Sequence, residues 1–396
     1  MNPAKIVILS YFQVILSESN MDIQQVKQRF SIIGTYPGLD RAIDMAESKP
    51  GACIVKQRPM ETAAMIDGRD LDWDEVTAKA QPHECVPVAA TDPLYILYTS
   101  GTTGVPKGIL HTHHNRTQFA SMFAIDYRID SSAVNIVTTA LYANETWLTM
   151  MPTVFAGGTL VLMTAFDPRE FLELVQKEKC THTFMVPTQF TVLLEQPDFD
   201  SYDLSSMRIW NSAGSPLRVR TKTEVIKRFN GELVELWGLT EGVATTLKPE
   251  DMEKKMESVG IPLVGWDVRI IDKEGRELPW GETGEIVAHS SFLMPEYYKL
   301  PDKTAEAIWL DASGKTYLKT GDMGKLDEDG FLYILDRKKD MIISGGINIF
   351  ASDIEEVLSR HPAVQDAIVI GIPHPKWGET PLAMVIPRGG TAISEE

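Results

Sequence analysis

The regular alternation of apolar runs and amphipathic stretches between residues 94 and 230 is the feature that most constrains the fold of this chain. The run GGTLVLM at 157–163 has the composition of a buried strand, and the helix-like segment DPREFLELVQKEK at 167–179 follows it. The strand-like run THTFMVP at 181–187 then repeats the pattern. Strands that alternate with helices are typical of a largely parallel sheet covered by helices, so we predict an α/β fold.

The pattern of apolar segments and turns in the sequence changes beyond about residue 258. Residues 259–290 contain short apolar segments joined by glycine-containing turns, and the Asp-Gly pair at 329–330 predicts a further hairpin. Short strands joined in this way favour an antiparallel sheet. We therefore expect a β-barrel-like section to follow the parallel α/β part.

The charged junction DRKKD at 336–340 separates this section from a second α/β pattern. Ser352 followed by Glu355 predicts a helix that starts with a capping box. We expect a large N-terminal domain over residues 1–337, a hinge near 337–340 and a small C-terminal α/β domain over residues 338–396.

Composition excludes several other classes. The chain has 38 basic and 55 acidic side chains, and a net charge of −17 argues against a nucleic-acid-binding protein, which usually carries a basic face. Three cysteines without a CxxC pair fit a reducing compartment. No apolar run is long enough for a transmembrane helix. We therefore predict a cytoplasmic protein without a membrane span.

The segment Tyr98–Gly108 is the strongest chemical signal. It places four serine and threonine side chains, three glycines and Lys107 in eleven residues at the end of a strand-like run. Glycines let the backbone approach an anion, hydroxyl and amide groups donate to phosphate oxygens, and the lysine adds positive charge. The spacing differs from that of the nucleotide-binding P-loop, because Lys107 follows a proline and precedes a glycine. The alternative interpretation is a surface loop without a ligand.

This segment resembles the phosphate-binding signature of the adenylate-forming acyl- and aryl-CoA ligases, adenylation domains and firefly-type luciferases. Four further segments resemble the same superfamily in the same order. They are Ser212–Pro216, Glu235–Glu241, Tyr317–Asp322 and Asp336–Asn348.

The resemblance implies a role for each matching residue. In the first segment, the residues implied to close over the phosphates of ATP are Thr99, Ser100, Gly101, Thr102, Thr103, Gly104 and Lys107. Those implied to line the adenine or the acyl pocket are Gly214, Ser215, Pro216, Trp237 and Gly238. Thr240 is implied to bind phosphate and Glu241 to hold Mg²⁺. Asp322 would bind the ribose, Arg337 would contact the ribose or a phosphate, and Lys339 lies at the hinge. Gly345 and Gly346 would line the tunnel for coenzyme A.

The implied chemistry joins a small-molecule carboxylic acid to coenzyme A in two steps, with ATP, Mg²⁺ and coenzyme A required. A carboxylate first displaces pyrophosphate from ATP, and a thiol then displaces AMP from the acyl-adenylate. The resemblance also allows a homodimer. Alternatives are the loading of a carrier protein, a luciferase-like oxidation, and a catalytically weak binding remnant.

Two departures from the superfamily pattern bear on these alternatives. A lysine that usually lies late in the C-terminal domain is absent, which favours a slow adenylation step, and the chain looks truncated at both ends. Residues 36–108 resemble propionyl- and acetyl-CoA synthetases, whereas the pocket-forming segments after them resemble ligases for longer or aryl acids. Ala143 stands after Tyr142 where a histidine is frequent. We therefore expect a non-polar acid larger than propionate.

Overall fold

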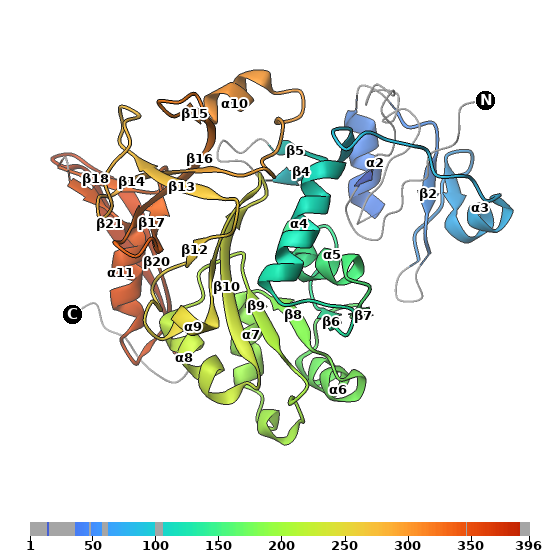
Figure 1. Cartoon of the computed structure of the whole chain (residues 1–396), viewed down its shortest axis with the longest axis horizontal. Helices are drawn as coiled ribbons and strands as arrows, with labels where there is room; N and C mark the ends of the chain where they lie inside the picture. The colour runs from blue at the N-terminus through green and yellow to red at the C-terminus, as the bar shows by residue number, and fades with distance from the viewer. Residues whose placement is uncertain are drawn as a thin grey trace. The chain divides into compact units, whose positions relative to one another are not determined.

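The computed structural model describes residues 14–15, 36–46, 49–57, 62–99, 106–345 and 347–388. The chain divides into two compact units that interleave along the sequence. Figure 1 labels the helices and strands named below. The first unit comprises Met1–Val234, Thr240–Gly242 and Ser291–Thr304. The second comprises Glu235–Leu239, Val243–Ser290 and Ala305–Glu396. None of the helices in the described ranges is long and apolar enough to cross a membrane.

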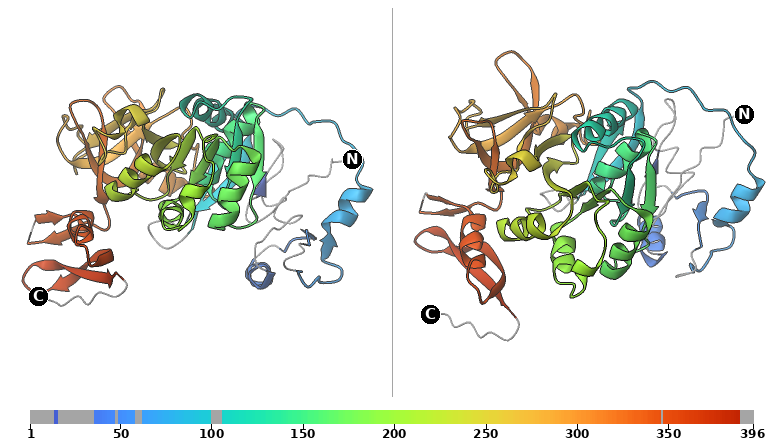
Figure 2. Two further views of the ribbon diagram at one scale, coloured as in Figure 1. Left: turned by 90° about the horizontal axis from the view of Figure 1, so that it is seen from below. Right: turned by 60° about the horizontal axis from the view of Figure 1, so that its bottom comes forward.

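A parallel sheet with the strand order β7-β6-β8-β9 forms the centre of the first unit. Its strands are β6 (Val134–Val137), β7 (Thr159–Leu162), β8 (His182–Met185) and β9 (Ile209–Ser212). The accompanying helices are α4 (His113–Asp126), α5 (Trp147–Phe155), α6 (Pro168–Glu178), α7 (Pro187–Leu194) and α8 (Val219–Arg228), with single helical turns η1 (Asn144–Thr146) and η2 (Phe199–Ser201). Figure 2 shows these helices packed around the sheet. The predicted α/β architecture is confirmed.

Helix α6 shows how local sequence produces these elements. The Asp167 side chain accepts hydrogen bonds from the backbone N–H groups of Arg169 and Glu170, which would otherwise be unsatisfied at the first turn. Pro168 occupies the first helical position, where its missing N–H costs nothing. Phe171 and Val175 are fully buried one turn apart, so they fix the face that packs on the core.

Antiparallel strands precede this sheet in the first unit. Strands β4 (Pro93–Thr99) and β5 (Lys107–Thr112) form a hairpin, and β1 (Val14–Ile15) pairs with β4. A small separate region contains α2 (Tyr36–Met45), β2 (Cys53–Val55), β3 (Asp70–Asp72) and α3 (Trp73–Lys79). The hairpin leads directly into α4.

The second unit is largely antiparallel. Strand β10 (Glu232–Leu239) enters it at Glu235 and pairs with β11 (Val243–Leu247), which pairs with β12 (Ile261–Pro262). A second sheet has the order β13-β14-β16-β15, with β17 paired to β16. Its strands are β13 (Asp267–Ile271), β14 (Gly284–His289), β15 (Ile308–Leu310), β16 (Thr316–Leu326) and β17 (Leu332–Arg337). The short helix α9 (Pro249–Met252) also belongs to this unit. Helix α10 (Pro301–Glu306) begins in the first unit, which includes Ser291–Thr304, and ends in the second.

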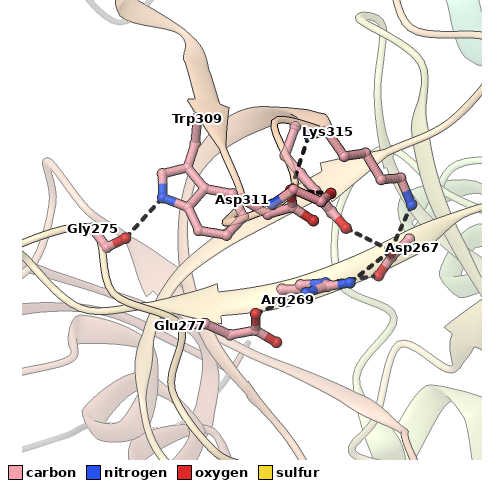
Figure 3. A network of polar contacts seen from close by, with 9 residues as sticks. Asp267, Arg269, Gly275, Glu277, Trp309, Asp311 and Lys315 are labelled. Atoms are coloured by element: carbon pink, nitrogen blue, oxygen red, sulfur yellow. Dashed lines mark hydrogen bonds and ion pairs between the residues drawn. The ribbon is translucent and has the colours of Figure 1, made fainter.

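A polar network fastens one end of this second sheet (Figure 3). Asp267 accepts from Lys315 at 2.7 Å and from Tyr317 at 2.6 Å, and it also pairs with Arg269. Arg269 in turn pairs with Glu277 at 2.7 Å. These contacts join strands β13 and β16 with the turns beside them. The strands of this sheet pair antiparallel, so the antiparallel arrangement predicted beyond about residue 258 is confirmed.

The C-terminal elements form a four-stranded sheet with the order β19-β18-β21-β20. They are β18 (Ile342–Ser344), β19 (Ile347–Ile349), α11 (Ala351–Ser359), β20 (Val364–His374) and β21 (Gly378–Pro387). Ile342, Ala351 and Val369 make the small apolar core between α11 and this sheet.

The predicted capping box at the start of α11 is wrong. The cap residue is Phe350, whose side chain makes no capping hydrogen bond, and the N–H of Ala351 in the first turn donates to Asp336 Oδ2 at 2.8 Å. Ser352 instead donates its hydroxyl to the carbonyl of Leu335, and Glu355 accepts from the backbone N–H of Val369 at 2.8 Å. Both side chains are used for tertiary contacts, which a local sequence motif does not reveal.

Candidate active site

The hydroxyl- and glycine-rich segment joins the two strands of the β4–β5 hairpin. Thr99 and Lys107 lie directly opposite each other at the end of that hairpin. The five residues Ser100, Gly101, Thr102, Thr103 and Gly104 lie outside the described residues. Because antiparallel strands bring both ends of a connecting segment together, the hairpin anchors this segment at one point of the first unit.

Lys107 lies beside two further side chains of the same unit. Its Nζ is 4.7 Å from the centroid of the Tyr297 ring, and the Tyr297 hydroxyl donates to Glu241 Oε1 at 2.8 Å. We call these three residues the Lys107 cluster. Burial and the neighbouring Glu241 carboxylate raise the pKa of Tyr297, so its hydroxyl stays protonated and remains a donor.

Backbone contacts hold the Lys107 cluster together. Ile109 of β5 forms a bridge with Tyr297, and the N–H of Tyr298 donates to the carbonyl of Gly108 at 2.7 Å. The N–H of Met294 donates to the carbonyl of Glu241 at 2.8 Å. Residues that are far apart in sequence are thereby fixed at the base of the predicted phosphate-binding segment.

The Glu241 carboxylate fits the expected magnesium ligand in chemistry. Carboxylate oxygens suit Mg²⁺, and the hydrogen bond from Tyr297 uses only part of the acceptor capacity of Glu241. The described residues contain no group of three or more acidic, histidine or cysteine side chains that could hold a metal alone. Mg²⁺ usually binds through one or two carboxylates together with substrate phosphates and water, so a single carboxylate beside a phosphate site is sufficient.

The segment Gly214–Pro216 follows the carboxyl end of β9 and is exposed. Gly214 has a positive φ of 89°, and a Cβ atom there would lie 3.7 Å from Val186 and 4.0 Å from Glu145. Val186 follows the carboxyl end of β8. Ligands of α/β sheets bind outside the carboxyl ends of the strands, so this segment occupies the expected place for a bound nucleotide.

The predicted ribose-binding group lies in the second unit. Asp322 of β16 is only 2% exposed. Its Oδ1 pairs with Arg337 Nε at 2.8 Å, and its Oδ2 accepts from Trp237 Nε1 at 3.1 Å. Asp322 and Arg337 are direct cross-strand neighbours in β16 and β17. Gly238 follows Trp237 in β10, where a Cβ would clash at 2.5 Å with the carbonyl of Val243.

The predicted hinge and tunnel residues also belong to the second unit. Lys338 pairs with Glu285 at 2.7 Å, whereas Lys339 is exposed and lies 3.7 Å from Asp340. Gly345 has a φ of 59°, and a Cβ there would lie 2.8 Å from the ring of Trp377. Gly346 lies outside the described part of the chain.

The predicted residues thus form two groups, one in each unit. The first unit contains Lys107, Gly214, Thr240 and Glu241, and the second unit contains Trp237 and Asp322. The sequence analysis did not identify Tyr297, because its partners Lys107 and Glu241 lie far from it along the chain. The Tyr-Tyr pair at 297–298 was the signal that the sequence offered.

Comparison with known proteins identifies the class. The family model described as AMP-binding enzyme matches residues 27–298, and the model of the AMP-binding enzyme C-terminal domain matches residues 353–396. A feruloyl-CoA synthase from Amycolatopsis sp is 34% identical over 90% of this chain and 72% of that protein. The medium/long-chain-fatty-acid–CoA ligase FadD8 from Mycobacterium tuberculosis is 33% identical over 81% of this chain and 57% of that protein.

A solved structure supports the same family. The O-succinylbenzoate coenzyme A synthetase from Bacillus subtilis, in complex with ATP and a magnesium ion, superposes with a TM-score of 0.74 at 27% identity, over 90% of this chain and 73% of that one. Fold and site therefore define an adenylate-forming ligase. The chain belongs to the AMP-binding enzyme family. The predicted ligase class, with ATP, Mg²⁺ and coenzyme A as its requirements, is confirmed at the level of the family.

Proposed function

We propose that this chain activates a non-polar carboxylic acid larger than propionate and transfers the acyl group to coenzyme A. The observation that carries the proposal is the Lys107 cluster, which places an ammonium group and a carboxylate at the base of the predicted phosphate-binding segment. The acids named for two relatives, ferulate and medium- or long-chain fatty acids, support this substrate class.

In the first step, a carboxylate oxygen of the acid forms a bond to the α-phosphorus of ATP, and the bond to the bridging oxygen breaks. Pyrophosphate leaves with that electron pair. Lys107 neutralises charge on the phosphates, and Thr240 donates its hydroxyl to them. Glu241 would hold Mg²⁺, which would supply further neutralisation of phosphate charge.

In the second step, the thiolate of coenzyme A forms a bond to the acyl carbonyl carbon, and AMP leaves with the electrons of the acyl–phosphate bond. Asp322 accepts hydrogen bonds from the ribose hydroxyls, and Arg337 holds the Asp322 carboxylate in place. The chain 337–340 serves as the hinge between the predicted domains 1–337 and 338–396. Lys339 lies within this hinge, and Gly345 and Gly346 border the path of the thiol.

The test is to incubate the chain with ATP, Mg²⁺, coenzyme A and a panel of straight-chain and aryl acids, and to follow pyrophosphate, AMP and thioester. We expect all three products. Thr240→Ala and Asp322→Ala should each lower kcat/KM for ATP by roughly 10- to 100-fold, the effect of losing a hydrogen bond to a charged group. Lys79→Ala, on exposed α3, is the control.

The outcomes separate the alternatives. Pyrophosphate without thioester would favour a carrier protein as the acceptor, and nucleotide binding without products would favour a binding remnant. Equal activity of the two site variants and the control would refute the site assignment. The cytoplasmic location and the homodimer stay proposals, which fractionation and light scattering test.

A further inference from the structure

We propose that Tyr297 is a positioning residue that orients the Glu241 carboxylate for Mg²⁺ and keeps the Lys107 ammonium directed at the triphosphate. The inference rests on the proposed function and deepens it. Tyr297 contacts both groups at once, through its hydroxyl on one side and its ring face on the other.

The hydroxyl acts on the carboxylate. A glutamate side chain has three rotatable bonds, and an unrestrained carboxylate must lose that freedom when it binds a metal. The 2.8 Å hydrogen bond from Tyr297 to Oε1 fixes the plane of the Glu241 carboxylate before any ligand arrives. The remaining oxygen then has one defined direction in which to meet a metal ion.

The ring acts on the ammonium. An aromatic face attracts a cation without neutralising it, because the ring carries no net charge. Among the ion pairs of the described residues there is none between Lys107 and Glu241, although both contact the same tyrosine. Tyr297 therefore keeps the two opposite charges from pairing with each other, and the full positive charge of Lys107 remains for phosphate.

The tyrosine itself is held firmly. It is 5% exposed, its backbone bridges Ile109, and its N–H donates to Thr304 Oγ1 at 3.0 Å. Gly242 brings the neighbouring turn against the same segment, since a Cβ there would lie only 2.4 Å from the carbonyl of Phe292. Groups fixed in this way need no rearrangement when the ligand binds, which is the requirement for a preorganised site.

Tyr297→Phe tests the hydroxyl alone because it retains the ring. Calorimetric titration of the full chain with Mg²⁺ at saturating ATP should show a Kd raised by roughly tenfold, the effect of one hydrogen bond to a charged group. The Kd for ATP in the presence of a chelator should stay unchanged. Tyr297→Leu, which also removes the ring, should weaken the metal-free binding of ATP as well. Tyr202→Phe, a half-buried tyrosine after η2, is the matched control.

A double-mutant cycle separates positioning from folding. If Tyr297 acts through the carboxylate, Tyr297→Phe should have little further effect on Mg²⁺ binding in a Glu241→Gln background. Additive effects, or an unchanged Kd for Mg²⁺ in Tyr297→Phe, would overturn the inference while leaving the proposed function intact. A wild-type chain that binds no ATP with or without Mg²⁺ would overturn both.

Discussion

Two side chains of the second unit hold the Asp322 carboxylate, one on each oxygen. Asp322 is almost completely buried, whereas the Arg337 side chain is 46% exposed. A buried carboxylate that loses its cation keeps its desolvation cost and loses part of the compensation for it. The pair therefore matters for stability as well as for the proposed ribose contact.

Arg337→Met should lower the free energy of unfolding by about 1–2 kcal/mol, a value reduced for the solvent exposure of the guanidinium. It should also raise KM for ATP, because Asp322 loses its contact with Arg337. Urea denaturation and steady-state kinetics measure the two effects. Arg360→Met is the control, since the exposed Arg360 directly after α11 also pairs with a glutamate, Glu356. Equal denaturation midpoints for the two variants would contradict the prediction.

We expect the stability of the first unit to depend on pH through His182. It is fully buried, its Nε2 faces the carbonyl of Tyr127 at 3.1 Å, and its Nδ1 faces the Thr181 hydroxyl at 2.7 Å. This arrangement fits a neutral ring that donates from Nε2 and accepts at Nδ1. Burial lowers the pKa of His182 to about 4.

Because the folded pKa lies below the unfolded value of about 6.5, the unfolded chain binds the proton first as pH falls. Stability from this residue is complete above about pH 6.5 and is lost progressively towards pH 4, by up to about 3 kcal/mol. His182→Gln should flatten the pH dependence of urea unfolding in this window. His83→Gln, an exposed control, should leave it unchanged. A steep dependence retained in His182→Gln would assign the effect to other groups, such as buried His111, whose pKa is also lowered by burial.

Among the elements, α6 formed where its sequence predicted, because cap, proline and apolar face all lie within the helix itself. The start of α11 did not follow its motif, because Ser352 and Glu355 bond to Leu335 and Val369 instead. Local signals therefore predicted elements whose partners are local. They failed where a distant backbone group competed for the same side chain.

Asp167→Ala tests the local contribution to α6. It removes both side-chain hydrogen bonds of the cap and should cost about 1 kcal/mol of unfolding free energy. Urea denaturation followed by circular dichroism measures the change. Glu173→Ala, at an exposed position of the same helix, should change stability by less than about 0.5 kcal/mol. A loss as large in Glu173→Ala would show that the cap is not the cause.

At the scale of the whole molecule, the sequence predicted the family, the α/β part and the antiparallel part, because each rests on contiguous segments. It did not predict that the two units interleave. Thr240–Gly242 and Ser291–Thr304 belong to the first unit although second-unit residues separate them along the chain. That arrangement depends on backbone contacts such as Met294 with Glu241. Such backbone contacts also hold the Lys107 cluster together, so the sequence alone did not predict that Tyr297 belongs to the site.

The short connection between β10 and β11 also restricts how many residues this turn can contain. Leu239 pairs with Val243, so the turn between the two strands consists of Thr240, Glu241 and Gly242. One inserted or deleted residue would have to slide one strand against the other, which turns every side chain of that strand to the opposite face, or pull Glu241 out of reach of Tyr297. Substitutions can be accommodated in this corner more readily than any change in its residue count.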